Sequence, residues 1–148
     1  MLYLAQQRGM SAAAIEDLLY HRSGLLGVSG LASDMRTLLA SDAPAAREAV
    51  ELFAYRAARE AAALAGALGG LDGFVFTAGI GEHAAPVRAL IAERLGWLGV
   101  SLDPAANAAG AGRISAARSA VQVWVVPTDE EAMIAHHTLE TIASQGEA

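Results

Sequence analysis

The sequence predicts an α/β domain, and three observations support this prediction. First, Phe74–Thr77 is a short run of aromatic and β-branched residues, which favours a strand buried on both faces of a sheet. Second, a similar run at 121–126 (VQVWVV) predicts another strand. Third, alanine-rich segments with apolar residues at helical spacing surround both runs. Short buried strands between amphipathic helices are typical of an α/β fold.

Helical periodicity and capping residues place the helices around these strands. Ser11 is a candidate N-cap, while Pro44 and Gly69 suit the first turn and the stop of the longest helix. We expect helices over 2–8, 12–21, 33–39, 44–68, 84–95, 105–109 and 129–143. The predicted buried face of the longest helix carries Val50, Phe53, Ala57, Ala61, Leu64 and Leu68, and that of the last helix carries Met133, Ile134, His137 and Ile142.

Two shorter segments connect these helices. The apolar run Ser23–Gly30 is interrupted by glycines, so we expect a loop that packs over the core or lines a cleft, or else a plain buried connection. Trp97 and Leu98 follow the predicted 84–95 helix, and we expect them to anchor its end in the core.

Composition limits the possible functions. The 148 residues suffice for one domain, and the absence of cysteine excludes disulfides, thiolate metal sites and thiol nucleophiles. A net charge of −6, with arginines that form no dense patch, argues against nucleic-acid binding. There is no lysine for a P-loop, no recognisable signal peptide and no apolar stretch long enough to span a membrane. We therefore expect a cytoplasmic protein.

The segment Ala78–His83 (AGIGEH) links the first strand to the next helix. A glycine turn between a strand and a helix presents backbone N–H groups to a phosphate or another anion. Glycine also lets a ligand approach the backbone closely, because it has no Cβ. The alternative is that the two glycines only form a tight connection between the elements.

A dinucleotide-binding turn is a further alternative for the same segment. Gly79, Gly81 and Ala84 fit the pattern Gly-x-Gly-x-x-Ala, and Asp103 lies about 20 residues beyond, where such a turn needs an acid to contact the ribose. Glu82 argues against this alternative because it would place a carboxylate inside the pyrophosphate cradle. The lack of a clear βαβ unit after the turn also argues against it.

Three acidic residues, Asp129, Glu130 and Glu131, follow the second strand and begin the last helix. Ligands of α/β sheets bind at the carboxyl ends of strands, so one of these carboxylates is a candidate ligand for the Mg²⁺ that accompanies a nucleotide. The alternative is that they only cap the helix and complement its dipole. His136 and His137 point in different directions on one helix, so they predict no metal site.

Three stretches in a fixed order resemble the C-terminal part of acetate kinases. They are Leu25–Gly27 with Ser33–Arg36 (SDMR), Val75–Glu82 (VFTAGIGE) and Val126–Glu131 (VPTDEE). Each motif is weak alone, but their order and spacing are specific, and the likeness extends from about Leu2 to Ile142. The resemblance implies an actin-like, sugar-kinase-like ATPase fold (ribonuclease H-like), with residues 1–148 forming part of the C-terminal nucleotide-binding domain.

The resemblance also implies a function. Members of this family transfer phosphate from ATP to acetate with Mg²⁺, giving acetyl phosphate and ADP, and are usually cytoplasmic homodimers. Carried over by position, the resemblance assigns Gly79, Ile80, Gly81, Glu82 and His83 to the nucleoside and its phosphates, Asp34, Met35 and Arg36 to the adenosine, and Glu130 to Mg²⁺. From the residues alone, Asp34 is an ordinary cap and Arg36 a solvated charge. The family pattern commonly has asparagine where this chain has His83.

The resemblance covers only part of an acetate kinase. The family's N-terminal domain and the start of its C-terminal domain are missing, and with them the arginines, aspartate and histidine that act on the transferring phosphoryl group. Phosphoryl transfer depends on positioning and charge neutralisation, so we expect no catalytic residue here and no activity from this stretch alone. The alternatives are a kinase for propionate or butyrate, and an inactive fragment that binds nucleotide or dimerises.

Overall fold

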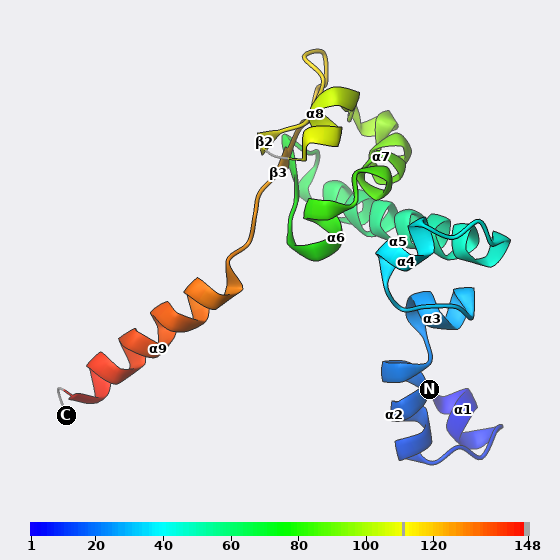
Figure 1. Ribbon diagram of the computed structural model, residues 1–148. Helices are drawn as coiled ribbons and strands as arrows, with labels where there is room; N and C mark the ends of the chain where they lie inside the picture. Colours follow the sequence, from blue (N-terminus) through cyan, green and yellow to red (C-terminus); the bar gives the residue numbers. More distant parts are fainter. Residues whose placement is uncertain (111, 147–148) are drawn as a thin grey trace.

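The computed structural model describes residues 1–110 and 112–146, with side chains as far as residue 142. Its elements are α1 (Leu2–Gln6), α2 (Ala12–His21), α3 (Gly24–Ser29), α4 (Met35–Leu39), α5 (Pro44–Leu68), β1 (Gly73–Phe76), α6 (Ala78–His83), α7 (Ala85–Arg94), the 3₁₀ helix η1 (Gly96–Leu98), α8 (Pro104–Ala109), β2 (Gly112–Arg113), β3 (Gln122–Val125) and α9 (Glu130–Gly146). Figure 1 shows a body around α5, α7 and the strands, with α1 and α2 below it and α9 extending to the left.

The three strands form one mixed sheet in the order β1-β3-β2. β1 and β3 are parallel, with Gly73 opposite Gln122 and Phe76 opposite Val125. β2 pairs with β3 in the antiparallel direction. Because β1 and β3 are parallel, their carboxyl ends lie at the same edge of the sheet. Both strands that the sequence predicts are therefore confirmed, and they are neighbours although 44 residues lie between Phe76 and Val121.

The hydrophobic core joins one face of the sheet to α5 and α7. The buried residues of α5 are Ala46, Ala49, Val50, Ala54, Ala58 and Ala65. Most are alanines about four residues apart, and their small side chains let the neighbouring helices approach the α5 backbone closely. Leu64 and Leu68 are 65% and 74% exposed, so the prediction that they are buried is wrong. The close-packed stripe follows the small residues rather than the large ones.

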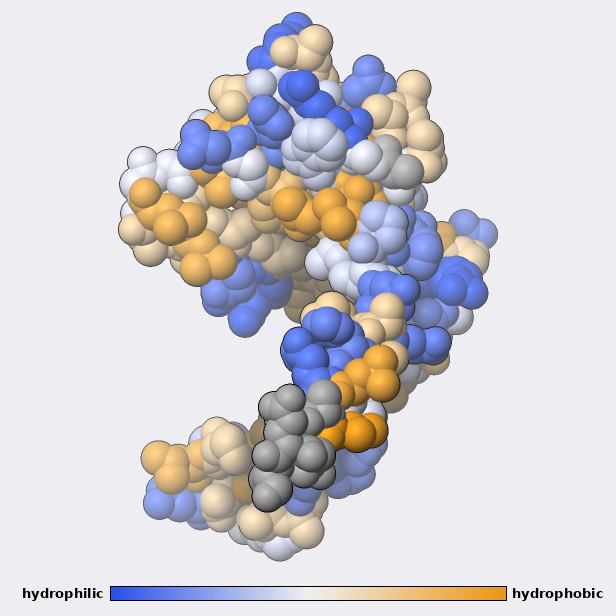
Figure 2. Space-filling model, turned by 90° about the vertical axis from the view of Figure 1, so that its left-hand side faces the viewer, coloured by the Kyte–Doolittle hydropathy of each residue, from blue (hydrophilic) through white to orange (hydrophobic). Residues whose placement is uncertain are grey.

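The opposite face of the sheet is open. Val75 is 53% exposed and lies beside Trp124, which is 38% exposed. Successive side chains of a strand point to opposite faces, so the inward side chain of β1 is Phe76 and the outward one is Val75. The prediction that β1 is buried on both faces is therefore wrong here. Figure 2 shows hydrophobic atoms on the side of the body from which α9 extends.

Two segments that the sequence predicts as irregular are helical. α3 occupies the middle of Ser23–Gly30 and ends at Gly30, whose φ of +64° is left-handed. Gly27 has little space around it, because a Cβ there would lie 2.9 Å from the carbonyl oxygen of Arg22. The segment predicted as an open glycine turn forms α6. Glycine disfavours helices in isolation, but packing overrides this weak preference.

The last helix has no packing partner among the described residues. Figure 1 shows α9 leading away from the body, and every described side chain of α9 is exposed. The predicted inward positions Met133, Ile134, His137 and Ile142 are therefore wrong in this structure. Trp97 is also exposed, whereas Leu98 packs against the core as predicted. Within the described part of the chain, no helix combines the length and apolarity that a membrane span requires.

Candidate functional site

The carboxyl ends of β1 and β3 bring two of the predicted motifs together. The Val126 N–H donates to the Phe76 carbonyl oxygen at 3.0 Å, which extends the strand pairing to the edge of the sheet. α6 follows β1 directly, and residues 126–129 lead from β3 into α9. Ligands of α/β sheets bind at this kind of edge. The fold therefore places the glycine-rich segment and the acidic segment where a ligand is expected.

A carboxylate joins these two segments. Glu82 Oε1 accepts hydrogen bonds from the backbone N–H and from the hydroxyl of Thr128, both at 2.9 Å. These bonds, the backbone one first, hold the pKa of Glu82 below its usual value, because they stabilise the ionised carboxylate. Glu82 thus links α6 to the segment after β3. The Glu82 carboxylate, which lies in the glycine-rich segment, therefore has a structural role.

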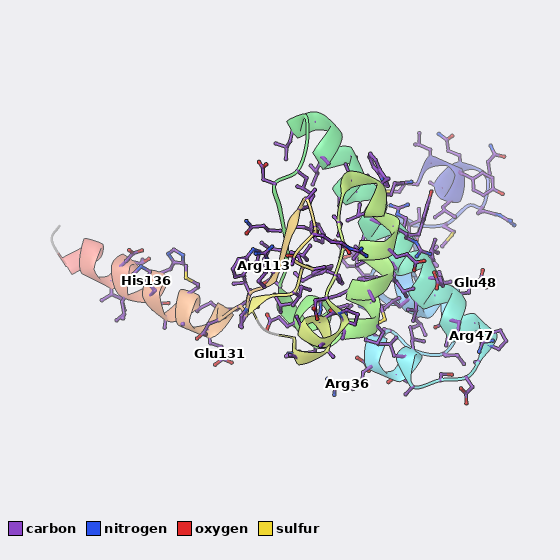
Figure 3. All side chains as sticks on the ribbon, turned by 90° about the horizontal axis from the view of Figure 1, so that it is seen from above. Arg36, Arg47, Glu48, Arg113, Glu131 and His136 are labelled. Atoms are coloured by element: carbon purple, nitrogen blue, oxygen red, sulfur yellow. The ribbon has the colours of Figure 1, made fainter. Side chains whose placement is uncertain are left out.

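A concave region, which we call the acidic hollow, lies between α6 and the start of α9. Its volume is about 410 Å³, and it is lined by Ala78, Gly79, Glu82, His83, Thr128, Asp129, Glu130 and Glu131. Asp129 accepts a hydrogen bond from the Ala132 N–H at 2.8 Å, so this carboxylate is a helix cap. Glu130 and Glu131 are exposed, and Figure 3 shows Glu131 at the end of α9 that is nearest the body.

A second concave region, the α4–α6 hollow, has a volume of about 280 Å³. It is lined by Ser33, Asp34, Met35, Arg36, Leu39, Gly79, Ile80, His83 and Ala84. Asp34 caps α4 and accepts hydrogen bonds from the backbone N–H and hydroxyl of Thr37, at 3.0 and 2.9 Å, which lower its pKa. Met35 is buried in the core, whereas Arg36 is exposed.

α6 connects the two hollows, because Gly79 and His83 line both. A Cβ at Gly79 would have no heavy atom within 4 Å, whereas at Gly81 it would lie 3.3 Å from the carbonyl carbon of Phe76. Gly79 therefore faces open space, and Gly81 lets α6 pack closely on β1. Of the residues that the sequence analysis assigns to the site, all line one of the two hollows except Gly81.

The backbone is strained where α6 begins. Ala78 has a φ of +58°, a left-handed value that no other non-glycine residue adopts in the described part of the chain. This conformation costs about 1–2 kcal/mol for a residue with a Cβ. Such strain is often found at functional sites, where the surrounding structure holds it in place. Ala78 lines the acidic hollow, so the strained residue lies next to the carboxylates that are candidate ligands for Mg²⁺.

Two features of the site escape sequence reasoning. One is the bond between Thr128 and Glu82, which joins residues 46 apart and has no local pattern. The other is Arg88, which is 1% exposed and donates to the carbonyl oxygens of Gly81 and Glu82. A signal for Arg88 did exist. It lies three residues before Ile91 on the predicted 84–95 helix, which places it on the apolar face.

The donor set for a metal is small. Among the residues that the structure describes, no three or more His, Asp or Glu side chains are grouped to hold an ion. A single exposed carboxylate such as Glu130 fits Mg²⁺ only when phosphate oxygens and water complete the coordination. Asp103 accepts a hydrogen bond from the Ala106 N–H at 2.9 Å and caps α8. The acid that the dinucleotide alternative requires therefore has a structural role.

Solved structures identify the class of fold. An acetate kinase from Porphyromonas gingivalis matches with a TM-score of 0.83 and 36% identity, covering 95% of this chain and 37% of that one. A propionate kinase from Francisella tularensis subsp. tularensis SCHU S4 matches with a TM-score of 0.81 and 36% identity, covering 89% of this chain and 35% of that one. The fold is the actin-like ATPase fold of these carboxylate kinases, represented in part, as the sequence predicts.

The sequence comparisons identify the family. The model of the acetokinase family matches residues 1–136. Acetate kinase from Rhodopseudomonas palustris (strain TIE-1) is 63% identical over 139 residues, which are 93% of this chain and 35% of that protein. Acetate kinase from Rhizobium meliloti is 59% identical over 144 residues, which are 97% and 37% of the two chains. The chain belongs to the acetokinase family, and it spans about a third of the length of these curated relatives.

Proposed function

We propose that this chain supplies the nucleotide-binding half of an acetate kinase and corresponds to an incomplete C-terminal domain. In that reaction an acetate oxygen attacks the γ-phosphorus of ATP, the bond to the β–γ bridging oxygen breaks, and acetyl phosphate and ADP form. The observation that carries the proposal is the position of α6 between two hollows at the carboxyl edge of the sheet. Membership of the acetokinase family supports the reaction type.

The two hollows suit different parts of the nucleotide. The α4–α6 hollow combines the buried Met35 with the exposed, charged Arg36, so an apolar surface for the adenine lies beside polar groups for the ribose. Asp34 would act mainly through its cap on α4, because Thr37 already occupies its carboxylate. The phosphates would lie along α6, where Gly79 leaves open space.

The acidic hollow is the proposed place of the metal. Mg²⁺ prefers carboxylate, phosphate and water oxygens. Asp129 is used as a cap and Glu82 is bound to Thr128, so Glu130 and Glu131 are the carboxylates of this hollow without either duty, and the resemblance to acetate kinases assigns the metal to Glu130. Glu130 would therefore bind Mg²⁺ directly or through water, and the nucleotide would supply further oxygens. The bound ion would neutralise negative charge on the phosphates.

Binding and turnover are expected to separate in this chain. Among the described arginines, Arg88 is buried and Arg36 lies on the α4–α6 hollow, so neither faces the acidic hollow, where the γ-phosphate would lie. Transfer also needs a carboxylate pocket and groups that neutralise the transition state. We therefore expect Mg-ATP binding without acyl phosphate formation. Homodimer formation and a cytoplasmic location belong to this proposal for the longer protein.

A kinase for a longer carboxylate is the second candidate. The propionate kinase from Francisella tularensis resembles this chain as closely in identity, 36%, as the acetate kinase from Porphyromonas gingivalis does. The described residues contain no feature that selects between acyl groups. The choice between acetate and propionate therefore depends on a pocket that this part of the fold does not define.

Calorimetry with Mg-ATP, Mg-ADP and NAD, together with a hydroxamate assay for acyl phosphate with acetate, propionate and butyrate, tests the proposal. We expect binding of Mg-ATP and Mg-ADP, no binding of NAD and no acyl phosphate. A folded chain that binds no adenine nucleotide would overturn the nucleotide-binding role. Acyl phosphate formation by the chain alone would show that the missing groups are not required, and the preferred acid would identify the substrate.

A further inference from the structure

Arg88 is the largest fully buried side chain among the described residues. It lies at the end of the first turn of α7 and is 1% exposed. Burial lowers the pKa of its guanidinium, because the charged form loses contact with water. An arginine remains protonated even so. A full positive charge is therefore buried directly behind α6.

Every hydrogen bond recorded for this guanidinium goes to a neutral acceptor. Nη1 donates to the carbonyl oxygens of Gly81 and Glu82, at 2.9 and 2.8 Å. Nε donates to Asn107 Oδ1 at 2.8 Å, and Nη2 donates to the Asn107 carbonyl oxygen at 2.5 Å. Among the ion pairs of the described residues, none includes Arg88. The charge is compensated by carbonyl and amide dipoles alone.

Two of these acceptors belong to the C-terminal end of α6. The last carbonyl groups of a helix have no partner within it, and a cation at that end interacts favourably with the helix dipole. α6 has only six residues, so its own hydrogen bonds fix its position weakly. Arg88 therefore fixes the C-terminal end of α6 through the carbonyl oxygens of Gly81 and Glu82. The Glu82 carboxylate fixes α6 a second time, through its bond with Thr128.

The surrounding residues are arranged around the guanidinium. Asn107 is 7% exposed, and its Nδ2 donates to the Ala85 carbonyl oxygen at 3.0 Å, which links α8 to the start of α7. Gly110, at the end of α8, has a φ of +68°, and a Cβ there would lie 3.4 Å from Arg88 Nη2. A hydrophobic residue of similar volume often stabilises a fold as well as a buried ion does. Stability alone is therefore a weak reason for a charge at this point.

We propose that Arg88 is a positioning residue for nucleotide binding: it fixes α6 and so sets the place of Gly79 and His83 between the two hollows. This inference rests on the proposed nucleotide-binding role of α6. Arg88 is behind the site and acts through α6. Its replacement should therefore weaken nucleotide binding more than an equal loss of overall stability would.

The test compares Arg88→Lys with Val121→Ala. Lysine keeps the charge but offers one nitrogen with three donors, so it cannot reproduce all four hydrogen bonds that the guanidinium makes to α6 and α8. Val121 is 1% exposed and lies at the opposite, amino-terminal edge of the sheet, so Val121→Ala lowers stability without touching α6. Asn107→Ala is the milder variant in case Arg88→Lys does not fold, since it removes one side-chain acceptor of Arg88.

Two measurements are made on each folded variant: amide hydrogen exchange of residues 77–84 relative to α5, and the Kd for Mg-ATP by calorimetry. We expect Arg88→Lys to raise the relative exchange and the Kd at least tenfold, and Asn107→Ala to raise both about threefold. We expect Val121→Ala to change neither more than twofold, although its unfolding midpoint falls.

The outcomes separate this inference from the proposed function. Unchanged relative exchange of 77–84 in the arginine and asparagine variants would overturn the positioning role, as would faster exchange with an unchanged Kd. An equal loss of affinity in Val121→Ala would show a merely structural effect and would also overturn it. If the unsubstituted chain binds no Mg-ATP, the proposed function fails, and the exchange data alone decide whether Arg88 fixes α6.

Discussion

Gly79 and Gly81 have different roles although they share one motif. A Cβ at Gly79 meets open space, whereas a Cβ at Gly81 meets the Phe76 backbone at 3.3 Å. We predict that Gly81→Ala lowers the free energy of unfolding by about 1–3 kcal/mol through overpacking. Gly79→Ala should stabilise α6 by about 0.5–1 kcal/mol, because alanine is the better helix former. It should also weaken Mg-ATP binding, because the methyl group would enter the space proposed for the phosphates.

Urea unfolding and calorimetry on the two glycine variants check this assignment. Each variant is the control for the other, since one is expected to change stability and the other affinity. Equal stability losses would show that Gly79 is also packed against the body. Unchanged affinity in Gly79→Ala would place the phosphates away from α6.

The strain at Ala78 is a second property of a single residue. A left-handed φ costs a residue with a Cβ about 1–2 kcal/mol, and glycine does not bear this cost. We predict that Ala78→Gly raises the free energy of unfolding by up to about 1 kcal/mol, after subtraction of the greater backbone entropy of glycine. Ala89→Gly, at an exposed position inside α7, should lower it by about 0.5–1 kcal/mol. Thermal denaturation of the two variants measures these changes. The prediction would be contradicted if Ala78→Gly were destabilised as Ala89→Gly is.

The link between Glu82 and Thr128 joins two elements and depends on pH. The folded pKa of Glu82 is depressed, so its stabilising effect is fully present above the unfolded value of about 4.3 and is lost as pH falls through the folded pKa. Glu82→Gln keeps an acceptor oxygen but removes the charge. We predict that it is less stable than the unsubstituted chain at pH 7, and that the difference shrinks towards pH 3. Chemical unfolding at several pH values measures this, and a difference independent of pH would contradict it.

The start of α9 carries the proposed metal ligand. Mg²⁺ is expected to increase the affinity of the chain for ATP. We predict that Glu130→Ala reduces this increase about tenfold, because one of few hard ligands for the ion is lost. Glu131→Ala is a matched control, since it removes the same charge from the neighbouring exposed position of the same hollow. Calorimetric titrations of ATP at several Mg²⁺ concentrations compare the two. Equal effects would reduce the role of Glu130 to general electrostatics.

At the level of elements, local sequence patterns predict the helix starts, which local interactions determine. The cap residues Ser11 and Asp34 and the first-turn Pro44 begin their helices in the structure, because these effects act within one turn. The helical character of α3 and α6 was missed, because glycine-rich segments become helical only when packing compensates their low propensity. No local pattern predicts the bonds from Glu82 to Thr128 and from Arg88 to Asn107, because these partners lie 46 and 19 residues apart.

On the scale of the whole molecule, periodicity predicted an apolar face on α9, but no described element covers it. Met133, Ile134, Leu139 and Ile142 are each more than half exposed, and Val75 and Trp124 lie uncovered on the open sheet face. Monomeric proteins seldom expose such extended apolar surface. The relatives are nearly three times as long as this chain, which spans 35% of the Rhodopseudomonas palustris acetate kinase. These two surfaces are therefore the places where we expect the rest of an acetokinase fold to pack.

A complementation experiment tests this expectation. The part of the Rhodopseudomonas palustris acetate kinase that does not align with this chain is produced separately and mixed with it. We predict a stable one-to-one complex, quenched or shifted tryptophan fluorescence as Trp124 becomes buried, and acetyl phosphate formation that neither part shows alone. Ile134→Glu and Leu139→Glu place charges on the exposed face of α9, so each should weaken the complex at least tenfold while Mg-ATP binding by this chain is unchanged. Mixing without association, or association that both glutamate variants leave intact, would show that the apolar face of α9 is not the contact surface.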